Sequence, residues 1–201
     1  MRTSSFKTIL SVCAFLVIVS VGVAQAGAVI NFDDLPSYSK IPYDHYKAQG
    51  ILLSTPGAAV WEGYDPEANT LPNICFASWG DYVSADAPII VDFVLPGTTT
   101  PGVTSIVSFY LMDSEFGTGG TWKAEIFGAG GNLLDSISGN TNDEIFIGFA
   151  RPTHEIARLV FTPSEDREGI DTLAHCDVVP EPASLSILAL GALGLIFRRR
   201  R

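Results

Sequence analysis

Apolar and polar positions alternate through the middle of the chain with the two-residue period of β-strands. Trp122, Ala124 and Ile126 share one side of such a segment, and the positions between them are charged. Because no long segment between the two chain ends repeats its apolar residues every 3.6 positions, we expect strands and no long helix there. Further runs rich in β-branched and aromatic residues cover 29–32, 50–54, 89–95, 103–111, 133–137, 144–149 and 156–162.

Turn-forming residues separate these runs at short intervals. Gly130-Gly131-Asn132 stands between two strand-like segments and is typical of a β-hairpin. Eight or more short antiparallel strands in one domain favour an all-β fold, an antiparallel β-sandwich of the jelly-roll type. A partly open barrel is the alternative that this pattern leaves.

Both chain ends are hydrophobic and stand outside this pattern. At the N-terminus, Arg2 and Lys7 precede an apolar stretch, and Ala24-Gln25-Ala26 is an A-x-A cleavage site. These parts predict a secretory signal peptide over residues 1–26, with cleavage after Ala26. An uncleaved N-terminal anchor is the alternative.

The C-terminus combines a short polar motif, an apolar run and a basic end. Pro180-Glu181-Pro182 precedes an apolar run over residues 185–197 and four arginines, Arg198–Arg201. A helix over residues 185–197 would rise only about 20 Å, less than the roughly 30 Å of bilayer hydrocarbon. The arginines would stay on the cytoplasmic side. We therefore predict a transmembrane helix that stops transiently in the membrane, with the Pro-Glu-Pro motif processed on the far side.

In this order, the three C-terminal parts closely resemble the PEP-CTERM sorting signal of Gram-negative bacteria, also called the ice-binding-protein C-terminal domain. The resemblance implies that residues 178–201 are handled by an exosortase, a membrane cysteine transpeptidase, in a bacterium that makes exopolysaccharide. It implies an exported protein that passes through the inner membrane to the cell surface or extracellular matrix. The resemblance concerns a route and not an activity, and an ordinary C-terminal membrane anchor is the alternative.

Without its two ends the chain leaves one domain over residues 27–177, which is long enough to bury a core. This region holds 6 basic and 21 acidic residues, a net charge of −15. Such a surface repels nucleic acid and anionic lipid, and no basic patch interrupts it, so nucleic-acid binding is not expected. Residues 177–182 are the one candidate linker to the C-terminal signal.

Several short segments of the domain carry a second resemblance. They are Ile30–Leu35, Phe146–Phe149, Ile156–Phe161 and Gly169–Leu173. They are similar to the galactose-binding-like or lectin-like jelly rolls that often precede this sorting signal, which implies the same fold here. Where such domains usually carry Asp followed by Asn or Asp, this chain has Asp171-Thr172.

Acidic residues near both ends of the domain are candidate metal ligands. Asp33 and Asp34 lie in the opening strand and Asp171 lies in the closing one. The first and last strands of a jelly roll commonly run side by side, so the three carboxylates could share a calcium ion, which prefers hard oxygen ligands. The alternative is structural, with Asp33 capping a turn and Asp171 accepting hydrogen bonds from backbone amides.

Two aromatic pairs are candidate ligand-binding residues. Trp61 with Tyr64, and Trp79 with Tyr82, stand beside glycine and acidic residues in segments whose turn residues predict loops. Exposed rings stack on sugar faces, while carboxylates accept hydrogen bonds from hydroxyl groups. The alternative is that one or both tryptophans fill the core, as we expect for Trp122.

Two cysteines remain once Cys13 leaves with the signal peptide. Cys75 and Cys176 form an even pair in an oxidising compartment, which predicts a disulfide bond. Two independent buried thiols are the alternative.

Catalytic motifs are lacking in this sequence. His154-Glu155 begins an H-E-x-x-H pattern, but Arg158 occupies the place of the second histidine. There is also no G-x-S-x-G motif and no phosphate loop. We therefore expect a non-enzymatic surface or matrix protein that binds carbohydrate or exopolysaccharide. A purely structural or adhesive matrix protein is the first alternative, and a secreted hydrolase is the second.

Overall fold

The computed structural model describes the domain and the start of the C-terminal signal. The predicted signal peptide, the apolar run over 185–197 and Pro182 lie outside the described residues. For residues 59–64, 73, 76–79 and 82–83 the structure describes the backbone alone. The described residues are 27–36, 38–55, 59–64, 73–79, 82–83, 87–112, 121–140, 144–163 and 169–181.

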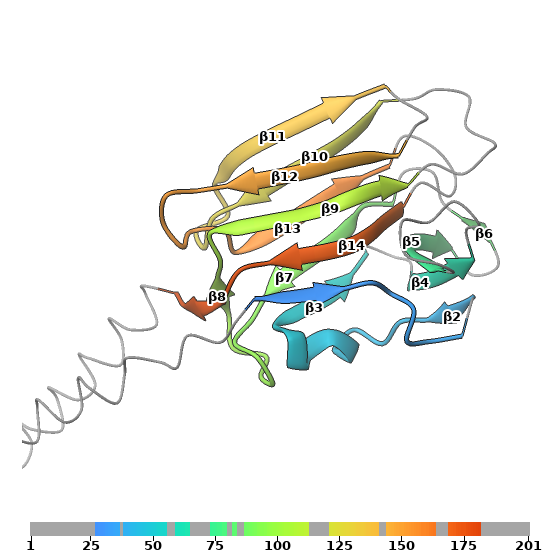
Figure 1. Ribbon diagram of the computed structural model, residues 1–201, viewed down its shortest axis with the longest axis horizontal. Helices are drawn as coiled ribbons and strands as arrows, with labels where there is room; N and C mark the ends of the chain where they lie inside the picture. The colour runs from blue at the N-terminus through green and yellow to red at the C-terminus, as the bar shows by residue number, and fades with distance from the viewer. Residues whose placement is uncertain are drawn as a thin grey trace, which may run out of the picture.

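Two large antiparallel sheets and a small two-stranded one form this part of the chain (Figure 1). The larger sheet has the strand order β12-β9-β14-β5-β4-β2, with β1 paired to β14 and β6 paired to β5. Its strands are β1 (Ala28–Ile30), β2 (Ser39–Lys40), β4 (Ala59–Tyr64), β5 (Asn73–Trp79), β6 (Tyr82–Val83), β9 (Ile106–Met112), β12 (Ile145–Ala150) and β14 (Gly169–His175). The smaller sheet has the order β11-β10-β13-β7-β3. Its strands are β3 (Ile51–Ser54), β7 (Ile89–Phe93), β10 (Trp122–Phe127), β11 (Leu133–Gly139) and β13 (Arg158–Thr162).

The chain passes back and forth between the two sheets, which is the connectivity of a jelly roll. From the smaller sheet at β7 it crosses to β9, returns to β10 and β11, crosses to β12, returns to β13 and ends in β14. The first strand lies beside this last long strand, with Ala28 opposite His175 in the register. The predicted fold class, an antiparallel β-sandwich of the jelly-roll type, is confirmed.

The core lies between the sheets and follows the alternation seen in the sequence. Trp122, Ala124 and Ile126 of β10 are buried, as predicted, while the positions between them face outward. Phe109 of the larger sheet and Phe161 of the smaller sheet are both fully buried and meet edge to face, with ring centroids 5.8 Å apart. Such aromatic contacts fix the spacing of the two layers.

The cysteine prediction is wrong, because Cys75 and Cys176 are not joined by a disulfide bond. Cys75 lies in β5 opposite Ile170, near one end of β14, and Cys176 follows the other end of β14. The strand from Ile170 to Cys176 spans about 20 Å. A disulfide bond joins Cα atoms less than about 7 Å apart.

The expected linker is folded as far as residue 181. Val178 is 7% exposed and belongs to the core cluster. The next two residues form β15 (Val179–Pro180), which pairs antiparallel with β8 (Gly102–Val103). The sandwich therefore extends beyond residue 177 and includes the first residues of the C-terminal signal. Among the described residues, no helix has the length and apolarity needed to cross a membrane.

Candidate functional site

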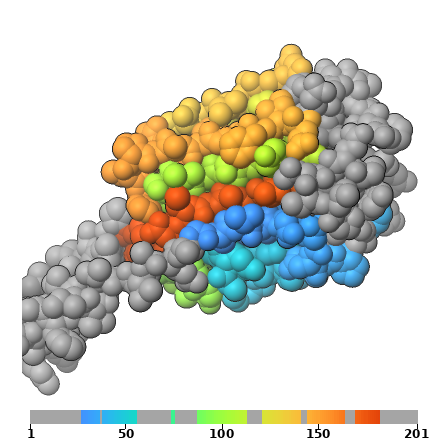
Figure 2. All heavy atoms as spheres, viewed as in Figure 1, coloured from blue at the N-terminus to red at the C-terminus, as the bar shows by residue number. Residues whose placement is uncertain are grey.

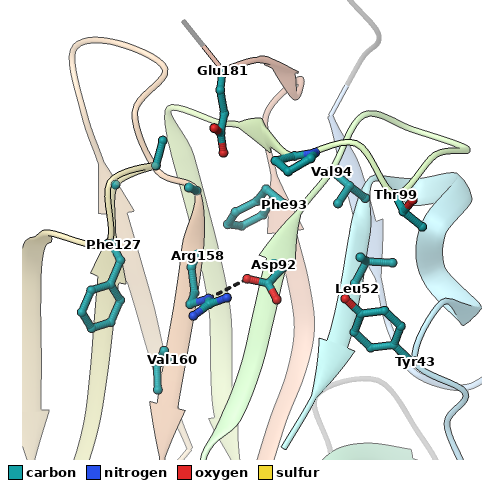
Figure 3. Close-up of a pocket in the computed structure, with 15 residues that line it drawn as sticks. Tyr43, Leu52, Asp92, Phe93, Val94, Thr99, Phe127, Arg158, Val160 and Glu181 are labelled. Atoms are coloured by element: carbon teal, nitrogen blue, oxygen red, sulfur yellow. Dashed lines mark hydrogen bonds and ion pairs between the residues drawn. The ribbon is translucent and has the colours of Figure 1, made fainter. Parts of the chain in front are cut away.

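A cleft of about 470 Å³ lies on the outer face of the five-stranded sheet, at the end where β15 joins the sandwich (Figure 3). Its floor is made by strands β3, β7 and β13, and its walls by three connecting segments. It is lined by Tyr43, Leu52, Asp92, Phe93, Val94, Thr99, Pro101, Phe127, Gly128, Ala129, Gly131, Ala157, Arg158, Val160 and Glu181.

The strand register brings the floor residues together from distant parts of the chain. Leu52 lies opposite Asp92, Asp92 opposite Arg158, and Arg158 opposite Phe127. Residues opposite one another in a sheet project from the same face. One row across four strands therefore presents two apolar side chains with a charged pair between them.

The charged pair is the polar centre of the cleft. Arg158 Nε donates to Asp92 Oδ1 at 2.6 Å, and the side chains are 49% and 25% exposed, respectively. A guanidinium carries five N–H donors in a fixed plane, and this bond uses one of them. The pair can therefore offer donors and carboxylate acceptors to a ligand while its own geometry is held by the sheet.

Apolar side chains flank this centre. Tyr43 is 53% exposed, and its carbonyl accepts a hydrogen bond from the Leu53 amide at 3.1 Å, which fixes the tyrosine segment beside β3. Leu52 is buried but lies outside the main core cluster. Figure 3 shows the Tyr43 ring and Leu52 on one side of the ion pair and Phe127 on the other. Such a mixture of apolar walls and a few fixed polar groups is typical of small-ligand sites.

Two turns complete the walls. The β10–β11 hairpin is closed by a hydrogen bond from the Gly128 amide to the Asn132 carbonyl, and Gly131 has a φ of +76° that favours glycine. This is the hairpin predicted from Gly130-Gly131-Asn132. On the other side, Leu95 donates to the carbonyl of Thr100, which closes the loop between β7 and β8.

The C-terminal motif reaches the same cleft. Pro180 is paired with Gly102 in the β15–β8 ladder, and the next residue, Glu181, lines the cleft. Figure 3 shows the Glu181 carboxylate pointing from the rim toward the cleft. The site thus contains two carboxylates, Asp92 on the floor and Glu181 at the rim.

Residues 178–201 match the family described as the PEP-CTERM protein-sorting motif. The chain carries a PEP-CTERM sorting signal. The match begins at Val178, so the PEP-CTERM signal starts inside the folded sandwich and not beyond it.

Other comparisons are distant. No curated protein matches the chain. A family 29 carbohydrate-binding module is 12% identical over 79% of this chain and 91% of its own, with a TM-score of 0.40. The xylan-binding CBM22-1 domain of Paenibacillus barcinonensis Xyn10C is 12% identical over 79% of this chain and 99% of its own, with a TM-score of 0.41. An arabinose-bound MgGH51 α-L-arabinofuranosidase is 14% identical over 79% of this chain but only 26% of the enzyme, with a TM-score of 0.43. At these values the similarities assign no ligand and no activity.

The structure corrects the placement of the four predicted ligand-binding aromatics. Trp61 and Tyr64 lie in β4, Trp79 ends β5 and Tyr82 begins β6, so these segments are strands and not loops. In the register, Trp79 is opposite Tyr82, whereas Trp61 is opposite Phe76. These positions lie in the eight-stranded sheet, whereas the cleft lies on the five-stranded sheet.

The structure does not bring the three predicted calcium ligands together. Asp34 pairs with His45 at 2.8 Å and accepts a hydrogen bond from the Tyr46 hydroxyl at 2.6 Å, which holds it against the short 3-10 helix η1 (His45–Gln49). Asp33 accepts from Asn31, and the buried Asp171 accepts from the Thr172 amide. Among the described residues, which include all three aspartates, no group of three or more His, Cys, Asp or Glu side chains is placed to hold a metal ion. The calcium prediction is therefore not supported, although the predicted adjacency of the first and last strands is correct.

The cleft residues were missed because their signal in the sequence is indirect. Asp92 interrupts the otherwise apolar β7 and Arg158 begins β13, both at positions that alternate with core residues. A charge at such a position faces outward, but two residues 66 positions apart in the sequence give no hint that they pair. Only the antiparallel register of β7 and β13 places them opposite each other.

Proposed function

We propose that this protein is exported, held at the inner membrane by its PEP-CTERM signal, processed there by an exosortase-type transpeptidase and released to the cell surface or extracellular matrix. The observation that supports this route is the match of residues 178–201 to the sorting motif. The net charge of −15 over residues 27–177 favours the solubility of the exported domain.

We propose further that the sandwich binds extracellular polysaccharide in the cleft on the five-stranded sheet. The carrying observation is the row of Leu52, Asp92, Arg158 and Phe127, in which a fixed ion pair lies between apolar side chains. A sugar ring has both kinds of surface, with hydroxyl groups at its edge and C–H groups on its faces. Tyr43 supplies an exposed ring beside the ion pair for the C–H face.

A glycan array probed with the exported protein tests the binding proposal. Arg158→Ala should remove or strongly weaken the binding of every glycan that the parent captures. Lys123→Ala is the matched control, because Lys123 forms a similar ion pair with Glu125 at 2.7 Å on the same sheet but does not line the cleft. Equal binding by the parent and by Arg158→Ala would contradict the cleft as the site. If Arg158→Ala retains glycan binding and truncation of Trp79 removes it, the binding site would instead lie at β5 and β6.

A secreted hydrolase is the second candidate, because Asp92 and Glu181 line one cleft. Glycoside hydrolysis needs two carboxylates on opposite sides of the scissile bond. Turnover of a bound glycan that disappears in Glu181→Gln would favour this function over binding alone. Binding without turnover in the parent would favour the binding module.

The sorting route has its own test. Replacing Pro180, Glu181 and Pro182 by alanine should leave the unprocessed protein in the inner membrane. Mass spectrometry of the mature parent should show a chain that has lost Arg198–Arg201. A surface form that keeps these arginines would contradict processing at the motif.

A further inference from the structure

The first residues of the sorting signal are anchored to the sandwich by several independent contacts. Asp177 Oδ1 forms a hydrogen bond with His154 Nε2 at 3.2 Å. Val178 is buried in the core cluster, and Val179 and Pro180 pair with Val103 and Gly102 of β8. The chain therefore enters the Pro-Glu-Pro motif while it is still part of the folded domain.

Val178 lies against Gly102 and Gly50, and the absence of a side chain at Gly102 leaves room for it. A Cβ atom at Gly102 would lie 2.4 Å from Val178 Cγ1 and 3.0 Å from the Val179 carbonyl oxygen. A Cβ atom at Gly50 would lie 3.4 Å from Val178 Cγ2, and Gly50 has a φ of +88° that ends η1. Any side chain at position 102 would displace the strand that carries the motif, because real Cβ atoms do not approach other heavy atoms so closely.

We propose that β15 is a latch that withholds the sorting motif from its processing enzyme until β15 leaves β8. The proposal rests on the processing proposed above. A transpeptidase must surround the backbone that it cleaves, but here Pro180 is paired on one side and Pro180 and Glu181 are half-buried against the sandwich. Cleavage then requires local opening of the last strand, which can occur without unfolding of the domain. When opening and closing are fast, the cleavage rate follows the population of the open form.

Gly102 allows the latch to be opened without touching the motif. It is distant from the motif in sequence, so an enzyme that reads residues 178–201 does not read position 102. Gly102→Ala should therefore speed processing by displacing β15. Gly148→Ala is the matched control, because a Cβ atom there would meet its neighbours at 3.5 Å or more, which is ordinary contact. Gly148 lies in β12 of the eight-stranded sheet, away from the β15–β8 pair.

The experiment follows the conversion of the full-length chain to its processed form by pulse-chase in its producing bacterium. We expect Gly102→Ala to be processed roughly threefold to tenfold faster than the parent, in proportion to the larger open population. Gly148→Ala should be processed at the parental rate. An unchanged or slower processing rate in a folded Gly102→Ala would overturn the latch. Docking of β15 would then either have no effect on the processing rate or be the form that the enzyme recognises.

A closed latch gives a test that general destabilisation cannot imitate. Val103 and Val179 are directly opposite in the ladder, so Val103→Cys with Val179→Cys can form a cross-strand disulfide. In a Cys176→Ser background, this chain should be processed at least about threefold more slowly than either single-cysteine chain, and a reductant should restore the rate. Equal processing rates in the locked and reduced chains would overturn the proposal. This test remains decisive even if Gly102→Ala fails to fold. If the parent itself keeps Arg198–Arg201, the sorting proposal fails and the latch fails with it. This result differs from one in which the parent is processed and the disulfide does not change the rate, which would contradict the latch alone.

Discussion

The two outer faces of the sandwich differ although their inner faces look alike. On the five-stranded face, ion pairs join strand residues, Arg158 with Asp92 and Lys123 with Glu125, and a cleft opens at one end. On the eight-stranded face, Phe146 is 60% exposed, and its ring meets that of Tyr110 with centroids 5.3 Å apart. Figure 2 shows that face as adjacent bands of β12, β9, β14 and β1.

The difference shows what alternation does and does not determine. Buried residues alternate with outward-facing ones in β7, β10 and β13 of one sheet and in β9 and β12 of the other, so the core needs only apolar side chains of suitable volume at the buried positions. The remaining positions face outward, and their chemistry decides what each face can bind. Paired charges beside apolar walls suit a ligand with hydroxyl groups. Exposed aromatic and aliphatic side chains do not by themselves select such a ligand.

The contrast between inner and outer positions can be broken on a single strand. Phe149 and Phe146 both lie in β12, but Phe149 is 3% exposed and Phe146 is 60% exposed. Phe149→Ala should lower the free energy of unfolding by about 3–5 kcal/mol through lost burial and a cavity. Phe146→Ala should lower it by less than about 1 kcal/mol. Urea unfolding of both variants measures the difference, and equal losses would mean that the outer ring is covered by a partner in solution.

The contrast between the two outer faces can be sharpened with a pair of tyrosines. Tyr43 stands at the cleft and Tyr110 stands on the eight-stranded face. Tyr43→Ala should weaken glycan binding by roughly tenfold, because a ring that stacks at a binding centre contributes more than about 1 kcal/mol. Tyr110→Ala should leave affinity unchanged. Titration calorimetry with a glycan captured by the parent provides the measurement, and the reverse pattern would move the site to the other face.

A third contrast, with a smaller expected effect, is between the core and the two outer faces. A charged side chain is tolerated on the outer faces but is disfavoured between the sheets. His175 is 7% exposed and lies against the Phe93 ring, and burial lowers its pKa below the usual 6.5, although bonds to the Cys176 and Gln49 carbonyls act in the opposite direction. The unfolded chain therefore binds more protons than the folded chain as the pH falls. Its contribution to stability is complete above about pH 6.5 and is lost as the pH drops toward the lower folded pKa.

Unfolding midpoints in urea at pH 7.5 and pH 5.5 test this sign. The parent should be less stable at pH 5.5, and His175→Gln should show a smaller difference between the two pH values. His45 and His154 are present in both chains, so the comparison isolates the effect of His175. A parent that gains stability at pH 5.5 relative to the variant would contradict the burial argument.

The sequence was a good guide to the layers and a poor guide to the site. The alternation of β10 predicted which of its side chains are buried, and the Gly130-Gly131-Asn132 turn predicted the hairpin, because both signals are local. Glycine and acidic neighbours lower the strand propensity around Trp61 and Trp79 and therefore predict loops. Strand pairing of β4 and β6 with β5 overrides this local preference.

The remaining features depend on contacts between distant segments. The Arg158–Asp92 pair needs the register of β13 on β7, and the anchoring of Val178 needs a glycine at position 102. The failed disulfide has the same origin, because the cysteine count is visible in the sequence but the length of β14 between the two thiols is not. Long-range register therefore decides each feature that local patterns could not.

A crystal structure of the exported protein with a glycan that it captures tests the central claim most directly. The account predicts sugar density over the row of Leu52, Asp92, Arg158 and Phe127, with a ring against Tyr43 and hydroxyl groups at the ion pair. Density over Tyr110 and Phe146, or along β5 and β6 with the cleft empty, would contradict it.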